Sequence, residues 1–316
     1  ARAFRVDSPR GPQGLAMAGA GVRDILLDGP WHHRDIAANG VRFHVAVGEH
    51  FSPRRPLVLL LHGFGEFWWA WRHQVPALDD AGFSAAAMDL RGYGASDKTP
   101  RGYDPQTTAF DVTGVIKSLG FSSGVVVGHD WGGMAAWAST AYAPAPVRAL
   151  ISVAAPHPLA FPWRSNLPTL AFFQVPLFPE RRIMADDGLY IEELLRSRAA
   201  DGPGFLTSAE ARHYRDALML WPSPHCALEY QRMFVRNHFS TMGRDFRMML
   251  RQSRAIPLLS IHGQEDQLIP LSAMAAAERW IDARHDLISL PGVGHLPHEE
   301  GPKVVTSAII DWLTAL

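Results

Sequence analysis

The chain has 316 residues, of which 47% are apolar, enough to build a sizeable core in one large α/β domain or two smaller ones. Its 30 Lys and Arg residues nearly balance 31 Asp and Glu residues, and the resulting net charge of -1 leaves no basic stripe of the kind that nucleic acid requires. A single cysteine, Cys226, excludes an internal disulfide framework and predicts a reducing, cytoplasmic location.

The chain is predicted to begin with a disordered leader over residues 1–23. The stretch before Met17 is rich in Pro, Gly and Arg and shows no periodicity, and it lacks the apolar middle and small-residue cleavage site of a secretory signal. No later stretch reaches the roughly 18 apolar residues of a membrane span. We therefore leave the leader out of the fold argument and predict no membrane span.

Strands and helices alternate through the next part of the chain. Asn39-Gly40 stands between two partly alternating runs and predicts a β-hairpin with a type I′ turn. A helix is predicted over TTAFDVTGVIKSLG, with an apolar face of Phe110, Val112, Val115, Ile116 and Leu119. Short apolar runs predict strands buried on both faces of a mostly parallel sheet, and these runs are RPLVLLLHGFG, FSAAAMDLRGYG, SSGVVVGHDWGG, VRALISVAAPH, AIPLLSIHGQED and HDLISLPGVGH. The alternation predicts an α/β fold with helices on both faces of the sheet.

The alternation stops after Pro158. Residues 159–250 contain many helix formers and several prolines but no buried-strand pattern. The apolar group LPTLAFFQVPLFP within them is too short and too interrupted by proline to span a bilayer. We predict that this segment is a helical cap with an apolar underside, inserted into an α/β core that consists of residues 24–158 and 251–316.

Candidate functional residues follow the predicted strands, at the edge of the sheet where α/β proteins bind ligands. The glycines of GHDWGG fit the G-x-S-x-G nucleophile elbow, with Asp130 in the place of serine. An aspartate between glycines is often only a turn residue, but the preceding strand and the following run of small residues favour the elbow. Asp266 and His295 follow later strands, which gives the α/β-hydrolase order of nucleophile, acid and histidine.

The chain resembles α/β-hydrolase-fold epoxide hydrolases, of the branch that includes haloalkane dehalogenases, from about residue 29 to residue 316. HGFGEFWWAWR resembles the family's HGFPE-aromatic segment and MDLRGYGASDKTP its D-x-R-G-x-G-x-S-D loop. GHDWGG resembles its aspartate elbow and GHLPHEEGP its histidine segment. The resemblance implies the α/β-hydrolase fold and an aspartate nucleophile that works without a metal or an organic cofactor.

A carboxylate at the elbow can displace a leaving group from a saturated carbon, which produces an alkyl ester of the enzyme. His295, oriented by Asp266, is predicted to activate the water that hydrolyses this ester on Asp130. Glu265 is an alternative to Asp266, but the family pattern Gly-x-x-Asp favours Asp266. The oxyanion hole is predicted to consist of two backbone N–H groups, those of Phe64 and Trp131.

Other charged residues and histidines near these motifs have simpler interpretations. Glu299-Glu300 are interpreted as first-turn charges of the C-terminal helix, where the helix dipole favours anions. His295 and His298 leave a zinc ligand set incomplete, and the same holds for His32-His33. No metal site is therefore predicted.

The resemblance breaks at the groups that receive the leaving oxygen. Epoxide hydrolases use two lid tyrosines for this, but LEYQRMFVRN and FFQVP place Gln231 and Phe172 at those positions. We expect these two residues to line the pocket. Another lid donor is then needed, and the candidates are Tyr190, Tyr214 and Tyr230, with His225 and Gln231 as further possibilities.

Two other functions stay open. A haloalkane dehalogenase forms the same ester, and the indoles of Trp131 and Trp163 are N–H donors of the kind that a departing halide needs. Against it, many dehalogenases have Asn or Glu where this chain has Phe64. A ligand-binding protein without turnover is disfavoured, because a binder has no need for a charged aspartate on a strained elbow. The sequence thus favours a hydrolase of small apolar epoxides in detoxification or lipid metabolism, and it makes no prediction of oligomeric state.

Overall fold

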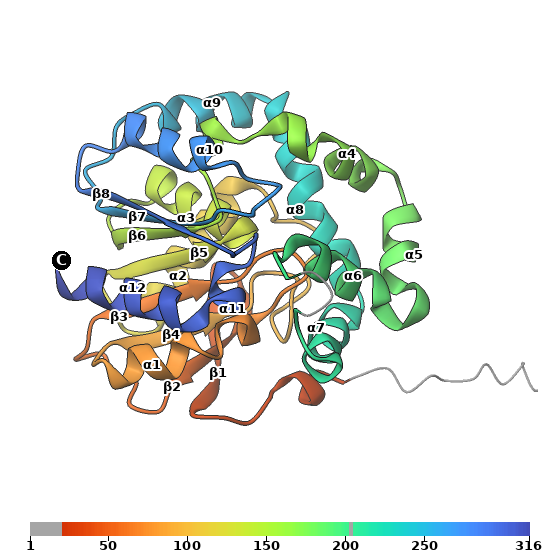
Figure 1. The fold of residues 1–316 in the computed structure, drawn as a ribbon, viewed down its shortest axis with the longest axis horizontal. Coiled ribbons are helices and arrows are strands. Elements are labelled where there is room, and N and C mark those ends of the chain that lie inside the picture. The colour runs from red at the N-terminus through yellow and green to blue at the C-terminus, as the bar shows by residue number, and fades with distance from the viewer. Residues whose placement is uncertain (1–20, 202–204) are drawn as a thin grey trace, which may run out of the picture.

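The computed structural model describes residues 21–201 and 205–316. Its centre is an eight-stranded sheet in the spatial order β1-β2-β4-β3-β5-β6-β7-β8 (Figure 1). β2 runs antiparallel to β1 and β4, and the remaining neighbours are parallel. The strands are Trp31–Ala38 (β1), Val41–Gly48 (β2), Leu57–Leu61 (β3), Ser84–Met88 (β4), Gly124–His129 (β5), Val147–Val153 (β6), Leu258–Gly263 (β7) and His285–Leu290 (β8). The predicted α/β-hydrolase architecture is confirmed.

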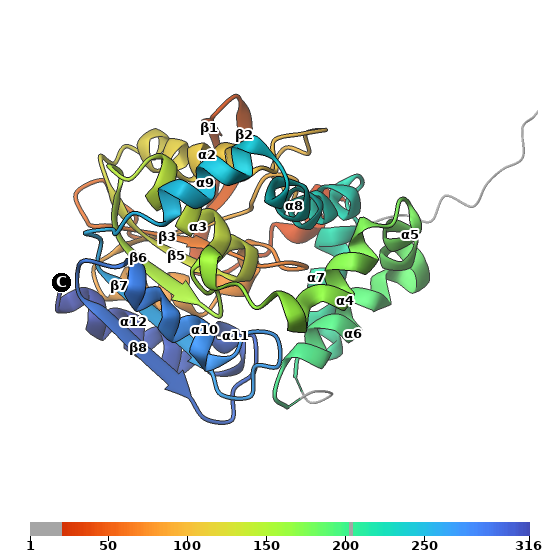
Figure 2. The ribbon, with the colours of Figure 1, turned by 90° about the horizontal axis from the view of Figure 1, so that it is seen from above.

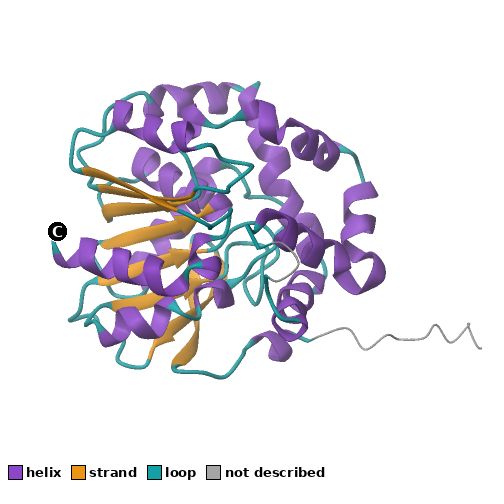
Figure 3. Cartoon of the chain, in the orientation of Figure 1, coloured by secondary structure: helices purple, strands orange, loops and turns teal. Residues whose placement is uncertain are grey.

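Helices cover both faces of this sheet (Figure 3). α1 (Gln74–Asp80) contacts α12 (Pro302–Thr314) on one face, and α2 (Pro105–Ser118) contacts α3 (Asp130–Tyr142) on the other. The other helices are α4 (Trp163–Gln174), α5 (Phe178–Met184), α6 (Leu189–Arg198), α7 (Ser208–Met219), α8 (Ser223–His238), α9 (Thr241–Leu250), α10 (Leu271–Ala275) and α11 (Pro297–Glu300). Short 3-10 helices are η1 (Val22–Ile25), η2 (Trp68–Trp71), η3 (Pro158–Ala160), η4 (Ala185–Gly188) and η6 (Ala276–Trp280).

The N-terminal hairpin forms as the sequence predicts. Asn39 and Gly40 have φ values of 45° and 77°, and Ala38 pairs directly with Val41. Positive φ at both central residues is the requirement of a type I′ turn. The turn therefore fixes the register of β1 against β2.

The predicted boundary of the leader at residue 23 is wrong, because residues 22 and 23 are folded. Residues 1–20 lie outside the described residues, but Val22 and Arg23 already belong to η1. Ile25 is fully buried, and its carbonyl accepts the indole N–H of Trp68 at 3.1 Å. The last residues of the predicted leader are therefore part of the fold. Within the described residues, no helix combines the length and the hydropathy needed to cross a bilayer.

One face of α2 differs from the prediction. Phe110 is 39% exposed, whereas the next residue, Asp111, is buried. Arg91 donates to both carboxylate oxygens of Asp111, at 2.8 and 2.5 Å. A bidentate ion pair satisfies a buried carboxylate, and this lets Asp111 take the inward position that the apolar pattern assigned to its neighbour.

The helices α4 to α8, here called the cap, lie beyond the carboxyl ends of the parallel strands (Figures 1 and 2). No described residue between β6 and β7 belongs to a strand. α9, the last part of the predicted cap segment, instead packs on the core, where Phe246 stacks on Tyr142 of α3 at 5.3 Å between ring centroids. The cap therefore faces the edge of the sheet where the candidate residues are found.

The contact between α3 and the end of β3 leaves no room for a side chain at Gly132. A Cβ atom there would lie 2.4 Å from the carbonyl oxygen of Leu61 and 2.5 Å from that of His62. We predict that Gly132→Ala lowers the free energy of unfolding by about 1–3 kcal/mol, measured by urea denaturation. Gly21→Ala is the control, because its new Cβ would meet its nearest atom at 3.6 Å. Equal stability of the two variants would contradict the close approach.

Candidate active site

Asp130 lies at the turn between β5 and α3. Its φ of 47° is in the left-handed region, which is uncommon for a residue other than glycine. The turn is tight, because a Cβ on Gly128 would lie 2.6 Å from backbone atoms of Gly132 and Gly133. This is the strand-to-helix turn that the glycine pattern predicts, with the carboxylate at its tip.

Three groups surround the Asp130 carboxylate. The backbone N–H of Phe64 donates to Oδ2 at 3.0 Å, His295 Nε2 lies 3.8 Å from Oδ1, and Arg198 Nη1 lies 4.0 Å from Oδ2. Burial works against ionisation of Asp130, but His295 and then Arg198 outweigh it and lower its pKa to about 2. Trp131, the other predicted oxyanion residue, is in the first turn of α3, where backbone N–H groups have no partner within the helix. Asp130 is therefore an ionised carboxylate, with one hydrogen bond from the Phe64 N–H and the charge of Arg198 on the side of Oδ2.

His295 pairs with Asp266 on its other side. Asp266 Oδ2 accepts the proton of His295 Nδ1 at 2.8 Å, and Oδ1 accepts two backbone N–H groups of its own loop at 2.8 and 3.0 Å. Glu265, the alternative acid, is exposed. Burial alone lowers the pKa of His295, but the charges of Asp266 and Asp130 prevail and raise it to about 10. The arrangement directs Nε2 of the imidazole toward Asp130.

The main chain of His295 is fixed from two directions. Its N–H donates to the carbonyl of Arg198 at 2.9 Å, at the end of cap helix α6. Its carbonyl accepts the Nε2 proton of His129 at 2.8 Å, and His129 directly precedes Asp130. The position of the imidazole therefore depends on both the cap and the elbow.

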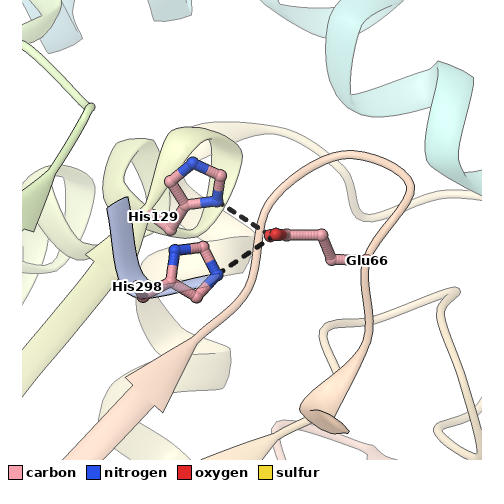
Figure 4. A group of neighbouring side chains, drawn as sticks. All are labelled: Glu66, His129 and His298. Atoms are coloured by element: carbon pink, nitrogen blue, oxygen red, sulfur yellow. Dashed lines mark hydrogen bonds and ion pairs between the residues drawn. The ribbon is translucent and has the colours of Figure 1, made fainter. Parts of the chain in front are cut away.

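A buried cluster of Glu66, His129 and His298 lies behind these residues (Figure 4). Glu66 Oε2 pairs with His129 Nδ1 at 2.8 Å and accepts the N–H of Gly63 at 2.5 Å, and Oε1 lies 3.2 Å from His298 Nε2. Burial opposes ionisation of Glu66, but the two histidines hold its pKa well below the ordinary value. His129 therefore connects the Glu66 carboxylate to the main chain of His295.

This cluster was missed by sequence reasoning, which considered His298 only as a partner of His295. Its three ligand atoms lie within 4.8 Å of one another, close enough for a metal ion. They already face one another in ion pairs, however, and the Gly63 N–H also points at the carboxylate. Hydrogen bonds account for the Oε2 side of the group, and Oε1 faces His298 Nε2 at 3.2 Å. The signal that could have found the group is the clustering of Glu and His beside the predicted catalytic residues.

The interpretation of Glu299 and Glu300 as charges of the C-terminal helix is wrong. α12 begins at Pro302, and the two glutamates end the short helix α11. Glu299 is buried and accepts from Arg72 at 2.5 Å and from the hydroxyl of Tyr214. Glu300 accepts three backbone N–H groups, those of Gly294, Leu296 and Ala200. The glutamates face inward because the cap and the histidine loop supply donors that sequence alone does not bring together.

Two of the candidate tyrosines use their hydroxyls elsewhere. Tyr214 donates to Glu299, and Tyr230 donates to the carbonyl of Arg91 at 2.9 Å. Tyr190 is half-buried, with the guanidinium of Arg182 at 5.2 Å from its ring centroid. His225, the further candidate, is partly exposed and pairs with Glu180 at 3.0 Å. These positions leave Tyr214 and Tyr230 without a free hydroxyl proton for a substrate.

Several buried donors, by contrast, have no hydrogen-bond partner among the described residues. They include the Gln231 amide nitrogen on cap helix α8 and the hydroxyl of Tyr93 in the core. Burial and then the charge of Asp130 raise the pKa of Tyr93 well above its ordinary value, so its hydroxyl keeps its proton. Gln231 was predicted to line the pocket, whereas Tyr93 was missed because it stands inside a loop motif without a chemical signal of its own.

The surroundings of the elbow are aromatic. Phe173 is fully buried and lies 5.3 Å from the Phe64 ring, whereas the predicted pocket residue Phe172 contacts Phe173 and Tyr190. A small hollow borders Trp131, which directly follows Asp130. Its lining is largely apolar and consists of Tyr103, Pro105, Thr108, Trp131, Met134, Ala135, Pro158, Tyr230, Phe234 and Phe246. Apolar walls therefore adjoin a strongly polar centre.

Comparisons with known proteins agree with this geometry. Residues 58–308 match the Alpha/beta hydrolase family. The chain is 32% identical over 286 residues to epoxide hydrolase 3 of Xenopus tropicalis, covering 87% of this chain and 75% of that protein. It is 27% identical over 321 residues to epoxide hydrolase A of Mycobacterium tuberculosis, covering 90% and 97%. The solved structure of an epoxide hydrolase from an endophytic Streptomyces superposes with a TM-score of 0.77 at 26% identity, covering 91% and 96%.

The buried cluster makes a prediction about stability. Glu66→Ala removes an acceptor and leaves His129, His298 and the Gly63 N–H buried without their partner. Breaking a buried ion pair from one side costs about 3–5 kcal/mol, and we expect a loss of that size in the free energy of unfolding measured with urea. Glu278→Ala, at an exposed glutamate of η6, should change it by less than about 0.5 kcal/mol. Similar stability of the two variants would show that the cluster is not a stabilising ion pair.

Proposed function

The chain belongs to the alpha/beta hydrolase family, among members named epoxide hydrolases, and we propose that it opens a small apolar epoxide to a diol through an alkyl ester on Asp130. The observation that carries the proposal is an ionised carboxylate at the tip of the elbow, with the His295–Asp266 pair beside it. A carboxylate attacks saturated carbon, and the resulting ester is then open to hydrolysis. All of these groups belong to the protein itself.

In the first step, Oδ1 of Asp130 attacks a carbon of the epoxide. The Phe64 N–H holds Oδ2, which leaves Oδ1 as the oxygen free to attack. The carbon–oxygen bond of the ring breaks, and its electron pair stays on the leaving oxygen. We assign this oxygen to Gln231 or Tyr93, which are among the buried donors without a partner in the described part of the chain; the charge of Asp130 also acts on Tyr93. The alkoxide then takes a proton, ultimately from water.

In the second step, water attacks the carbonyl carbon of the ester and His295 accepts its proton. The resting imidazole is protonated, because two carboxylates raise its pKa to about 10. Once Asp130 is an ester, one of those two charges is gone. His295 therefore releases its proton more readily at that stage and becomes the base that the step needs.

The hollow beside Trp131, the residue that directly follows Asp130, supports an apolar substrate. The hollow beside Trp131 is lined mainly by aromatic and aliphatic side chains, and Trp163 and Trp131 both pack against Phe234 at its edge, with ring centroids 4.9 and 5.3 Å away. Apolar walls with a few polar groups at one end are typical of small-molecule sites. We infer an aryl or lipid-like group beside the epoxide.

The ester intermediate can be tested by blocking its hydrolysis. We predict that His295→Gln, incubated with an aryl epoxide, gains the mass of one epoxide, and that peptide mapping places the adduct on Asp130. Asp130→Asn is the matched control and should gain no mass. An adduct from a haloalkane and none from the epoxide would assign the chain to dehalogenation, and no adduct from either would contradict the mechanism.

The role of Gln231 can be tested separately. Removing one donor to a developing negative charge costs about 10²–10³ in rate, so we predict a loss of that order in the alkylation rate of Gln231→Leu. Single-turnover mixing with the epoxide and mass spectrometry measures this rate. Tyr93→Phe is the comparison, and a loss only in that variant would assign the leaving oxygen to Tyr93.

A further inference from the structure

Arg198 is a cationic residue of the active site that no sequence motif indicates. It is the last residue of cap helix α6, and its side chain is only 10% exposed. Within the described residues, Asp130 is the one carboxylate at ion-pair distance, with Nη1 4.0 Å from Oδ2. The guanidinium also lies 5.9 Å from the centroid of the Phe64 ring. A nearly buried cation thus stands beside the same carboxylate oxygen that the Phe64 N–H contacts.

We propose that Arg198 is a catalytic residue, supplied by the cap, that stabilises the negative charge on Oδ2 while the Asp130 ester is hydrolysed. The proposal rests on the ester mechanism described above. It assigns the guanidinium to the oxyanion site, together with the Phe64 N–H, and gives it no role in the first attack.

The negative charge on Asp130 explains why Arg198 does not accelerate the first step, the attack on the epoxide. In the free enzyme the carboxylate carries a full negative charge, and Arg198 stabilises it. As Oδ1 attacks, that charge passes to the leaving oxygen. Arg198 therefore stabilises the starting state at least as much as the transition state, and an interaction of this kind does not accelerate a step.

In the second step, ester hydrolysis, negative charge develops on Oδ2 where it was absent before. The ester is neutral, and Oδ2 is its carbonyl oxygen. When water adds to the carbonyl carbon, His295 takes a proton and the electron pair of the carbonyl double bond moves to Oδ2. The bond to the product oxygen then breaks, that oxygen takes the proton from His295, and Asp130 loses a proton to return as a carboxylate. In this step, Oδ2 is negatively charged only from the addition of water until the bond to the product oxygen breaks. The Arg198 guanidinium, 4.0 Å from Oδ2, therefore stabilises the transition state and not the neutral ester.

The backbone of Arg198 makes a side-chain variant informative. Its carbonyl, which holds the His295 N–H at 2.9 Å, stays in place in Arg198→Gln. The position of the histidine loop should therefore survive the substitution, and circular dichroism with thermal unfolding checks this.

The test follows ester formation and ester hydrolysis in one experiment. The wild-type enzyme and Arg198→Gln are mixed with an aryl epoxide, quenched at intervals and analysed by intact mass. We expect the variant to form the ester as fast as the wild type or faster, and to hydrolyse it about 10–100-fold more slowly. In steady state kcat and KM should fall together, with kcat/KM preserved, because kcat/KM reports only the steps up to ester formation.

Two further variants, and the separate rates of ester formation and ester hydrolysis, test the role of Arg198. Arg198→Lys keeps the charge and should recover part of the hydrolysis rate, and Arg212→Gln, at an exposed arginine of the cap, should match the wild type. Slower ester formation with unchanged hydrolysis would overturn the proposal, as would unchanged rates for both steps. Either of these two results, together with normal ester formation in His295→Gln, would contradict the role of Arg198 but not the ester mechanism. The absence of any ester in His295→Gln would contradict the ester mechanism itself.

Discussion

The negative charge of Asp130, held at the edge of a parallel sheet, is the constraint on which the rest of the site depends. A carboxylate buried against a sheet must be neutralised or hydrogen-bonded, because desolvation of an unpaired charge is expensive. Here a backbone N–H, an imidazole and a guanidinium share that task, and each comes from a different part of the chain. The elbow, the histidine loop and the cap are therefore brought together around one carboxylate.

Buried polar contacts extend this arrangement away from the Asp130 carboxylate. His295 connects through its carbonyl to His129, and His129 connects to Glu66 and so to the loop that supplies the Phe64 N–H. On the cap side, Arg72 joins Glu299 to Glu210 of α7, with Nη2 3.2 Å from the latter carboxylate. The docking of the cap and the placement of His295 thus depend on the same set of contacts, and the loss of one contact weakens the others.

The sequence predicted the strands, the hairpin and the elbow, because these features depend on local patterns: continuous apolar runs, Asn-Gly, and glycines at fixed spacing. It did not predict the partners of buried charged groups. Asp111 faces inward because Arg91 meets it from another loop, and Glu299 is buried because Tyr214 comes from the cap. Arg198 had no signal at all, since an arginine at a helix end is normally a solvated charge, and only the folded chain places it against Asp130.

Tyr230 and Gln231 show how one position on a helix alters the chemistry that a side chain can offer. Successive residues of a helix point about 100° apart, so Tyr230 and Gln231 on α8 cannot face the same group. The ring of Tyr230 lies against Tyr93 and Tyr103, and its proton is used by a backbone carbonyl. An amide donates a hydrogen bond but does not give up its proton, so a site built on Gln231 can hold an alkoxide but must obtain the proton from water or from Tyr93. In the proposed mechanism the first step then depends more on the placement of the epoxide than on proton transfer, and the charge of Arg198 acts on the second step.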